Sequence, residues 1–417
     1  MSELDNKSAI LVTIAERSSE VEECERSLNE LERLLDTAGG VCFAKVIQVK
    51  ESFDPRTCIG KGKVEEISEL ASANNISLVI FDFELTPAQI RNLENDIGDV
   101  TVIDRSMLIL DIFALHAVTG EGKLQVELAQ LRYSAPRLTG KGIELSRQGG
   151  GIGSRGPGES KLETDKRHLH EKIVALEKRL AEMESNRATM RAQRDRSGLT
   201  KVALVGYTNA GKSTLLNRMT GAGVLAENKL FATLDPTTRK MELPSGESIL
   251  LTDTVGFIRK LPHHLVKAFR STLDEVKYAD ILLIVSDIND PEVPEHLRVT
   301  EEVISELGAS DKPVVYVYNK CDLGDNVILG AVNDTTVNVS AETGEGIDAL
   351  VGMVEQIMHR EHRQCSLLIP YSEQSVVNLL YKNHTVLSVD YADNGVLVEV
   401  ILDAKGRGQY SSYIIKE

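Results

Sequence analysis

Residues 8–115 alternate between short apolar runs and amphipathic helical patterns. Apolar runs that suit buried strands cover residues 10–14, 41–49, 78–81 and 100–103. Apolar positions at helical spacing cover residues 21–35, 64–73, 87–97 and 107–113. Strands that alternate with helices in this way usually form a parallel sheet with helices packed on its faces. The pattern therefore predicts an N-terminal parallel α/β domain over residues 1–115.

Two longer helical patterns follow. The first has apolar positions at Leu124, Leu128 and Leu131, and the second has them at Leu169, Ile173, Leu176, Leu180 and Met183. The second series alternates spacings of four and three residues, which is typical of a coiled-coil stripe. Because a glycine-rich segment separates the two patterns, we expect an antiparallel helical hairpin over residues 116–198.

The predicted tip of this hairpin, residues 137–161, contains eight glycines and five basic residues against two glutamates. Residues 137–201 carry a net charge of +6, whereas the rest of the chain sums to −22. Composition leaves two interpretations open. The segment is either a mobile linker with solvated charges or a loop that becomes ordered on a phosphate backbone.

The last segment, residues 362–417, has a helical pattern over 373–381 and alternating strand patterns over 386–391 and 396–402. Residues 392–395 read Ala-Asp-Asn-Gly, and Asn-Gly is common in the turns of β-hairpins. We therefore expect a small C-terminal α+β domain, and no catalytic motif is recognisable in its sequence.

Composition narrows the class of protein. The chain has 417 residues, of which 42% are hydrophobic and 26% charged, with a formal net charge of −16. This length and balance predict several globular domains, and the acidic excess argues against a protein that coats nucleic acid. The five cysteines lack Cys-x-x-Cys spacing, and no apolar run approaches the ~20 residues of a membrane span. We expect a reduced, cytoplasmic monomer without membrane insertion, with peripheral membrane association left open.

Residues 206–213 read Gly-Tyr-Thr-Asn-Ala-Gly-Lys-Ser, between a strand pattern at 201–205 and a helical pattern at 214–220. A strand, a glycine-rich loop and a helix in this order predict a phosphate-binding loop. The loop N–H groups, the start of the helix and the Lys212 ammonium would meet the charge of a polyphosphate. Ser213 would offer its hydroxyl to Mg²⁺.

Two downstream stretches predict a nucleotide-dependent switch. Residues 249–256 form a strand pattern that ends in Asp253 and is followed by Gly256. The carboxylate can hold the water shell of Mg²⁺, and the glycine N–H can sense the terminal phosphate. Between the two motifs lies the threonine-rich loop 231–238, from which Thr233 would bring a second hydroxyl to the metal.

Residues 314–322 predict the identity of the base, because a strand pattern there is followed by Asn319, Lys320, Cys321 and Asp322. The Asp322 carboxylate can accept hydrogen bonds from guanine N1–H and its 2-amino group, which adenine does not offer. Asn319 would bridge to the phosphate loop and the purine edge, and the Lys320 stem would cover the ring. The backbone of residues 339–342 would donate to guanine O6. These motifs, in this order, predict a Ras-like P-loop GTPase domain over residues 199–361.

The expected site thus binds GTP with Mg²⁺. Lys212, Asn209, Thr233 and Gly256 are expected to act in hydrolysis, and Ser213 and Thr233 to hold the metal. The residues expected to contact the nucleotide are Gly206, Tyr207, Thr208, Asn209, Ala210, Gly211, Lys212, Ser213, Phe231, Ala232, Thr233, Leu234, Asp235, Asp253, Thr254, Val255, Gly256, Asn319, Lys320, Cys321, Asp322, Ser340, Ala341 and Glu342.

The chain resembles the HflX family of ribosome-associated GTPases over nearly its whole length. Besides the nucleotide motifs, the resemblance depends on residues 54–57, 60–66, 155–165, 231–239, 253–259, 261–265 and 269–272. The stretches outside the nucleotide domain discriminate best, because any GTPase could share the others. The resemblance implies binding to the large ribosomal subunit and splitting of stalled or idle ribosomes under stress. It also implies a loop that reaches toward ribosomal RNA.

Other functions share the nucleotide motifs. One is a GTPase that acts in RNA modification or in ribosome-subunit assembly. RNA modification would need a cofactor-binding or nucleophilic site, and the sequence shows none. A metabolic phosphotransferase would not need the switch-like Thr233 and Gly256.

The hydrolytic step needs one further source of charge and orientation. Phe257 stands where many regulatory GTPases carry the glutamine that orients the attacking water, so we expect slow turnover until a ribosome orders the loop around Thr233. In potassium-stimulated GTPases that resemble this chain, an asparagine at the place of Asn209 helps to hold K⁺ beside the phosphates. Alternatively, Asn209 only suits the backbone turn of the loop.

Overall fold

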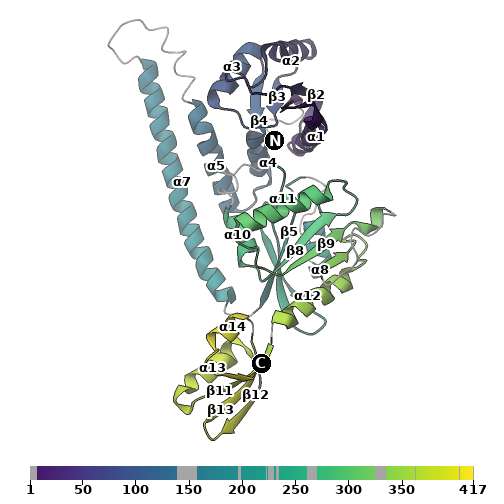
Figure 1. The fold of residues 1–417 in the computed structure, drawn as a ribbon. Coiled ribbons are helices and arrows are strands. Elements are labelled where there is room, and N and C mark those ends of the chain that lie inside the picture. The colour runs from purple at the N-terminus through teal and green to yellow at the C-terminus, as the bar shows by residue number, and fades with distance from the viewer. Residues whose placement is uncertain are drawn as a thin grey trace. The chain divides into compact units, whose positions relative to one another are not determined.

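The computed structural model of the chain describes residues 7–138, 157–195, 199–221, 223, 230–231, 234–260, 270–324, 335–361, 363–402 and 404–416. Three sheets lie within these residues (Figure 1). The chain divides into two compact units. The first comprises residues 1–184, 225–235 and 255–273, and the second comprises residues 185–224, 236–254 and 274–417. The bounds of the four domains predicted above stay a prediction.

The N-terminal sheet is parallel, as predicted, with the strand order β2-β1-β3-β4. Its strands are β1 (Ser8–Ala15), β2 (Val41–Val49), β3 (Leu78–Phe81) and β4 (Thr101–Asp104). Its helices are α1 (Val21–Thr37), α2 (Lys61–Asn74), α3 (Pro87–Ile97) and α4 (Arg105–His116). Apolar side chains of α2 and α3 form one core with the sheet, to which β1 contributes Ile10 and Val12. The alternate residues Ala9 and Leu11 are also fully buried, so both faces of β1 are covered.

The helices that follow β3 and β4 begin at specific side-chain caps. The Thr86 hydroxyl accepts from the Gln89 N–H at 3.3 Å, while the Gln89 side chain accepts from the Thr86 N–H at 2.9 Å. Asp104, the last residue of β4, accepts from the Met107 N–H at 3.0 Å. A cap of this kind contributes about 1 kcal/mol. The cap at Asp104 makes Arg105 the first residue of α4, directly at the end of the sheet.

Two helices, α5 (Gly120–Leu138) and α7 (Pro157–Asp195), follow the N-terminal sheet. Ion pairs join them between Arg132 and Glu177 and between Lys172 and Glu127. The predicted stripe of α7 is its less exposed side, with Leu176 5% exposed. One expectation was wrong in detail, because both ends of the predicted loop 137–161 are helical. A proline at the first helical position favours a helix start there. Residues 139–156 lie outside the described residues.

The nucleotide-binding sheet has the order β10-β9-β8-β5-β7-β6, in which only β6 runs antiparallel to its neighbour. Its strands are β5 (Thr200–Gly206), β6 (Thr237–Glu242), β7 (Ser248–Asp253), β8 (Ile281–Asp287), β9 (Val314–Asn319) and β10 (Thr336–Asn338). Its helices are α8 (Lys212–Thr220), α10 (Arg270–Tyr278), α11 (Val293–Glu306) and α12 (Ile347–Glu361). Thr237 and Thr238 were expected in a loop, which was wrong because they begin β6 and pair with β7.

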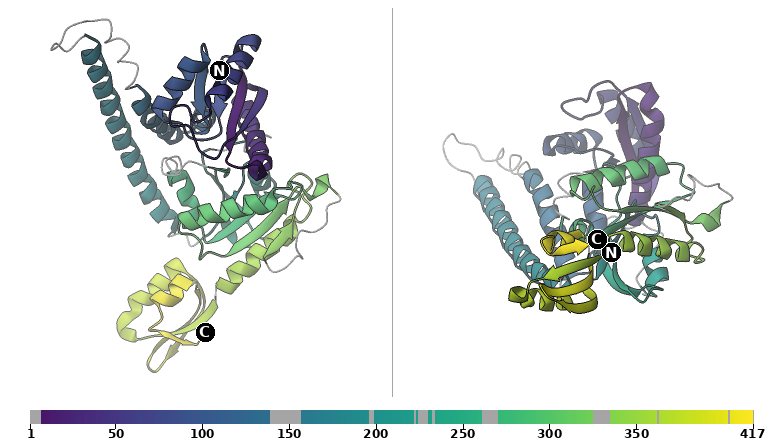
Figure 2. Two further views of the ribbon diagram at one scale, coloured as in Figure 1. Left: turned by 45° about the horizontal axis from the view of Figure 1, so that its top comes forward. Right: turned by 60° about the horizontal axis from the view of Figure 1, so that its bottom comes forward.

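The C-terminal sheet is antiparallel, with the order β12-β13-β11-β14 (Figure 2). Its elements are β11 (Arg363–Ile369), α13 (Gln374–Asn383), β12 (Thr385–Ala392), β13 (Gly395–Leu402), α14 (Ala404–Gln409) and β14 (Ile414–Lys416). The predicted hairpin is present, but Gly395 is a strand residue that pairs with Ala392, so Asp393 and Asn394 make the turn. A Cβ at Gly395 would lie 2.4 Å from the Ile369 carbonyl oxygen, which explains the glycine.

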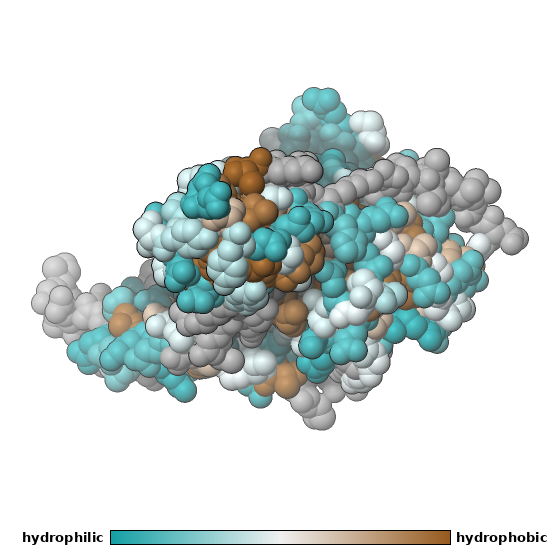
Figure 3. All heavy atoms as spheres, turned by 90° about the horizontal axis from the view of Figure 1, so that it is seen from below, coloured by the Kyte–Doolittle hydropathy of each residue, from teal (hydrophilic) through white to brown (hydrophobic). Residues whose placement is uncertain are grey.

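No helix in the described part of the chain is both long and apolar enough to cross a bilayer. The face seen in Figure 3 carries its hydrophobic side chains in small groups among hydrophilic ones.

Candidate nucleotide-binding site

The phosphate loop connects β5 to α8 in the second unit. Gly206 and Gly211 have φ angles of 141° and 93°, and Asn209 has a φ of 62°. A Cβ would lie 2.2 Å from the Val285 carbonyl oxygen at Gly206, and 2.2 Å from the Asn319 amide nitrogen at Gly211. The two motif glycines are therefore required both by backbone conformation and by close packing. Asparagine tolerates the left-handed conformation, so the turn interpretation of Asn209 has a structural basis.

Lys212 and Ser213 lie at the start of α8 with their functional groups turned to the loop and to β7. The Lys212 ammonium donates to the carbonyls of Gly206 and Tyr207 at 3.1 and 2.8 Å and is 6% exposed. The Ser213 hydroxyl donates to the Asp253 carboxylate at 2.6 Å, and Asp253 is fully buried. A hydroxyl and a carboxylate of this kind are oxygen donors that suit Mg²⁺. The phosphate loop and the strand end at Asp253 are therefore in direct contact in the fold.

Burial lowers the pKa of Lys212 to about 8, although the nearby Asp253 carboxylate opposes the shift. A bound phosphate favours the charged ammonium and raises this pKa, so nucleotide binding should take up protons. We expect about half a proton per GDP at pH 8 and about nine-tenths at pH 9. Calorimetric titrations in buffers of different ionisation enthalpy measure this uptake. At pH 8 the phosphates of GDP are fully ionised and guanine N1 keeps its proton, so a binding enthalpy at this pH that is independent of the buffer would contradict the prediction.

Asn319 ties the phosphate loop to the predicted base-binding loop. Its side-chain amide donates to the Ala210 carbonyl at 2.8 Å, and its side-chain oxygen accepts from the Ala341 N–H at 3.0 Å. The residue is 2% exposed. Residues 210 and 341 are thus held together by one side chain, as expected for an asparagine that bridges two loops of one site.

The residues after Asn319 present the predicted base contacts at the carboxyl end of β9. Lys320 has a φ of 65° and pairs with Asp287 at 2.8 Å. Cys321 and Asp322 lie in a short 3-10 helix, and the Cys321 N–H donates to the Val339 carbonyl at 3.2 Å. Asp322 is exposed, whereas Ser340 is fully buried and Glu342 is exposed. The Asp322 carboxylate is therefore accessible to a ligand at the expected edge of the sheet.

Sequence reasoning missed three supporting residues. Arg218 of α8 donates to the Ala341 carbonyl at 3.0 Å and also to the Glu342 carbonyl. Asp287, at the end of β8, holds Lys320, and Asn289 donates to the Lys320 carbonyl at 2.8 Å. No motif in the sequence identifies Arg218, because its partners lie more than a hundred residues away. The position of Asp287 at the end of a buried strand was the one available signal.

Thr254 lies in the second unit, where its hydroxyl donates to the Leu204 carbonyl at 2.6 Å. The other remaining candidate residues belong to the first unit or lie outside the described residues. Phe231, Leu234, Asp235, Val255 and Gly256 are in the first unit. There, the Asp235 carboxylate accepts from the N–H groups of residues 118 and 119 at 3.0 and 2.8 Å, just before α5. Ala232 and Thr233 are outside the described residues. The nucleotide and metal contacts assigned to all these residues stay predictions.

The four segments of the chain match four protein families in order. Residues 25–114 match the family described as GTP-binding GTPase N-terminal, and residues 116–194 match the GTP-binding GTPase Middle Region. Residues 201–320 match the family described as 50S ribosome-binding GTPase, and residues 328–408 match the HflX C-terminal domain.

Whole-length relatives give the same result. A GTPase HflX of Lacrimispora saccharolytica is 49% identical, with 95% of this chain and 94% of that protein covered. A GTPase HflX of Caldanaerobacter subterraneus is 47% identical, with 99% and 94% covered. The GTPase HflX of Escherichia coli is 44% identical, with 85% and 84% covered. With this identity over nearly the whole chain, and with a phosphate loop joined to a base-binding loop, the chain belongs to the HflX family of GTPases and is a GTP hydrolase.

Proposed function

We propose that this GTPase binds the large ribosomal subunit and splits or recycles stalled or idle ribosomes, with GTP hydrolysis as the switch. The match of residues 201–320 to the 50S ribosome-binding GTPase family is the single observation that carries the proposal. The charge of the chain supports it, because the net +6 of residues 137–201 in an otherwise acidic protein gives ribosomal RNA a local site. The proposal includes contact of residues 137–161 with this RNA.

In the proposed cycle, GTP binds with its phosphates on residues 206–213 and its base against Asp322. Mg²⁺ would be held by Ser213 and Thr233, and the Asp253 carboxylate would hold its water shell. When bound, the ion would neutralise charge on the β- and γ-phosphates. The short Ser213–Asp253 distance supports this site, because both oxygens can move onto an ion. Lys212 binds the same phosphates, and the Gly256 N–H senses whether the terminal phosphate is present.

The alternative function is that of a GTPase in ribosome-subunit assembly or RNA modification. Assembly would also need affinity for ribosomal RNA, so the basic charge of residues 137–201 does not separate it from splitting. A splitting factor must act on complete ribosomes, whereas an assembly factor must act on incomplete subunits. The two functions therefore differ in the particle that binds, and this difference sets the test.

Cosedimentation with separated subunits and with complete ribosomes tests the proposal. We expect the protein to bind the large subunit with a GTP analogue that resists hydrolysis, to bind more weakly with GDP, and to lose affinity as salt rises. Replacing Arg147 and Arg155 with alanine should weaken binding about tenfold or more, at about 1 kcal/mol for each lost phosphate contact. Intrinsic GTP hydrolysis should not change.

The matched control replaces Arg26 and Arg298, two exposed arginines outside the basic segment, with alanine. This control should bind like the unaltered protein, since each arginine pairs with glutamates of its own helix. Binding that is confined to incomplete subunits would favour the assembly function. Failure to bind any particle in either nucleotide would remove both.

A further inference from the structure

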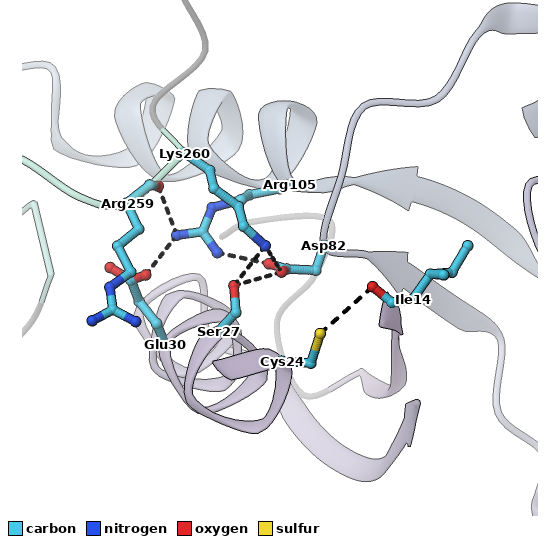
Figure 4. Close-up of polar contacts among 8 residues, drawn as sticks. All are labelled: Ile14, Cys24, Ser27, Glu30, Asp82, Arg105, Arg259 and Lys260. Atoms are coloured by element: carbon cyan, nitrogen blue, oxygen red, sulfur yellow. Dashed lines mark hydrogen bonds and ion pairs between the residues drawn. The ribbon is translucent and has the colours of Figure 1, made fainter. Parts of the chain in front are cut away.

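The first unit contains a cluster of four charged side chains from distant parts of the chain (Figure 4). Arg105 pairs with Asp82 at 2.7 Å and with Glu30 at 2.8 Å. The side chain of Arg105 is 2% exposed, and that of Asp82 is fully buried. The fourth member is Lys260, which pairs with the second oxygen of Asp82 at 2.8 Å. Lys260 belongs to the segment that follows the predicted phosphate-sensing residue Gly256, whereas the other three members of the cluster belong to the N-terminal domain.

Further hydrogen bonds fix the same segment. The Lys260 ammonium donates to the Ser27 hydroxyl at 3.0 Å, and that hydroxyl donates to Asp82 at 2.6 Å. Arg105 donates to the backbone carbonyl of Arg259 at 3.1 Å (Figure 4). The segment is therefore held through its backbone as well as through a side chain. Lys260 has a φ of 51°, a conformation that a lysine keeps only where its surroundings enforce it.

Lys260 adds a second cation to the cluster. Two carboxylates, Asp82 and Glu30, face two cations, Arg105 and Lys260, and the Lys260 side chain is 50% exposed. Burial by itself would raise the pKa of Asp82, but Arg105, Lys260 and the hydrogen bonds lower it below its usual value. Asp82 is therefore ionised, and removal of the ammonium would leave its buried negative charge with one fewer cation in contact. Such a charge is costly, so the cluster favours the docked segment.

The docked segment is close along the chain to the γ-phosphate sensor. Gly256 precedes Lys260 by four residues, which span at most about 14 Å. The other predicted switch segment is anchored in the same unit. Phe231 packs edge-on against Phe113 of α4 with ring centroids 4.8 Å apart, and the Leu230 N–H donates to Thr37 of α1 at 3.3 Å. Helices α1 and α4 thus hold both segments that the switch would move.

We propose that Lys260 and Asp82 are positioning residues for GTP hydrolysis, because their ion pair docks residues 255–260 on the N-terminal sheet and so sets the position of Gly256. The proposal rests on the role of Gly256 as the γ-phosphate sensor in the proposed function. When the pair is intact, the segment has one preferred position. When it is broken, ordering the segment at each turnover costs conformational entropy, and the rate of hydrolysis falls.

Steady-state hydrolysis by the full chain without ribosomes tests the proposal, so its outcome is independent of ribosome binding. Lys260→Met keeps the length of the side chain but removes its charge. We expect kcat to fall about fivefold with KM for GTP within about twofold, since the phosphate and base contacts stay intact. Lys260→Arg keeps the charge and should restore kcat to within about twofold of the unaltered protein. Lys240→Met is the matched control at an exposed lysine of β6, and it should change neither constant.

A second measurement separates positioning from stability. Hydrogen exchange of α1 should differ between GDP and a non-hydrolysable GTP analogue in the unaltered protein, and this difference should vanish in Lys260→Met while the midpoint of thermal unfolding changes little. Asp82→Asn should lower kcat about as much as Lys260→Met does. Adding Lys260→Arg to Asp82→Asn should not restore kcat, because the partner carboxylate is absent. Unchanged kcat and retained nucleotide dependence of exchange in Lys260→Met would overturn the proposal. A fall in kcat that only parallels lost thermal stability would overturn it as well.

Discussion

Asp322→Asn should convert the protein from a guanosine to a xanthosine nucleotide preference. In the proposed site the carboxylate would accept from guanine N1–H and the 2-amino group, whereas the amide would place a donor against that amino group. Loss of two charge-assisted hydrogen bonds should cost about 3 kcal/mol, or roughly 100-fold in GTP affinity. The same amide can donate to the 2-oxo group of xanthine, so XTP should bind better than GTP. Competition with labelled nucleotide measures both affinities.

The structure makes this experiment well controlled. Asp322 is exposed, so the substitution should not disturb folding, and the loop around it is held by backbone and by the Lys320–Asp287 pair. Hydrolysis of XTP by the variant should proceed at the rate that the unaltered protein shows with GTP, since the phosphate contacts are separate. Asp311→Asn, at an exposed aspartate of the same unit, should leave GTP selectivity intact. Unchanged GTP affinity in Asp322→Asn would show that this carboxylate does not face the base.

Much of the nucleotide site could be predicted from sequence because its parts are local. A phosphate loop needs a strand, two glycines and a helix start within about a dozen residues. All of these parts can therefore be recognised in one short stretch of sequence. The two glycines show why, since a Cβ at Gly206 or Gly211 would collide with Val285 or Asn319. The role of Asn319 could also be predicted, because the motif that contains it has one known geometry.

What the sequence did not reveal depends on partners that are far apart along the chain. Strand β6 was missed because five of its six residues are threonine or charged and give little apolar signal, so that only its pairing with β7 identifies it as a strand. Arg218 could not be recognised because the carbonyls that it holds come from another loop. Lys260 could not be recognised either, because its partner Asp82 directly follows β3 of the N-terminal sheet, far away along the chain. Such contacts follow from tertiary packing, which periodicity does not encode.

Large ribosomal subunits should accelerate GTP hydrolysis by at least about 100-fold, because a phenylalanine stands where many regulatory GTPases carry the glutamine that orients the attacking water. Phe257 follows Gly256 directly and is 1% exposed, so its ring is part of a packed core. A phenyl ring in that setting can neither hydrogen-bond water nor move easily to admit another group. Single-turnover assays with and without purified subunits measure the acceleration.

Phe257→Gln tests whether a glutamine at this position could supply the missing function. Burying an amide where a phenyl ring packed should lower the free energy of unfolding by roughly 3 kcal/mol and should leave basal hydrolysis slow.

Running the assays in KCl and in NaCl at equal ionic strength shows whether Asn209 helps to hold a K⁺ that adds positive charge beside the phosphates. Faster turnover in KCl that is lost in Asn209→Ala would assign part of the catalytic charge to this ion. Fast basal turnover in both salts, with no response to ribosomal subunits, would mean that this chain already contains a group that orients the water.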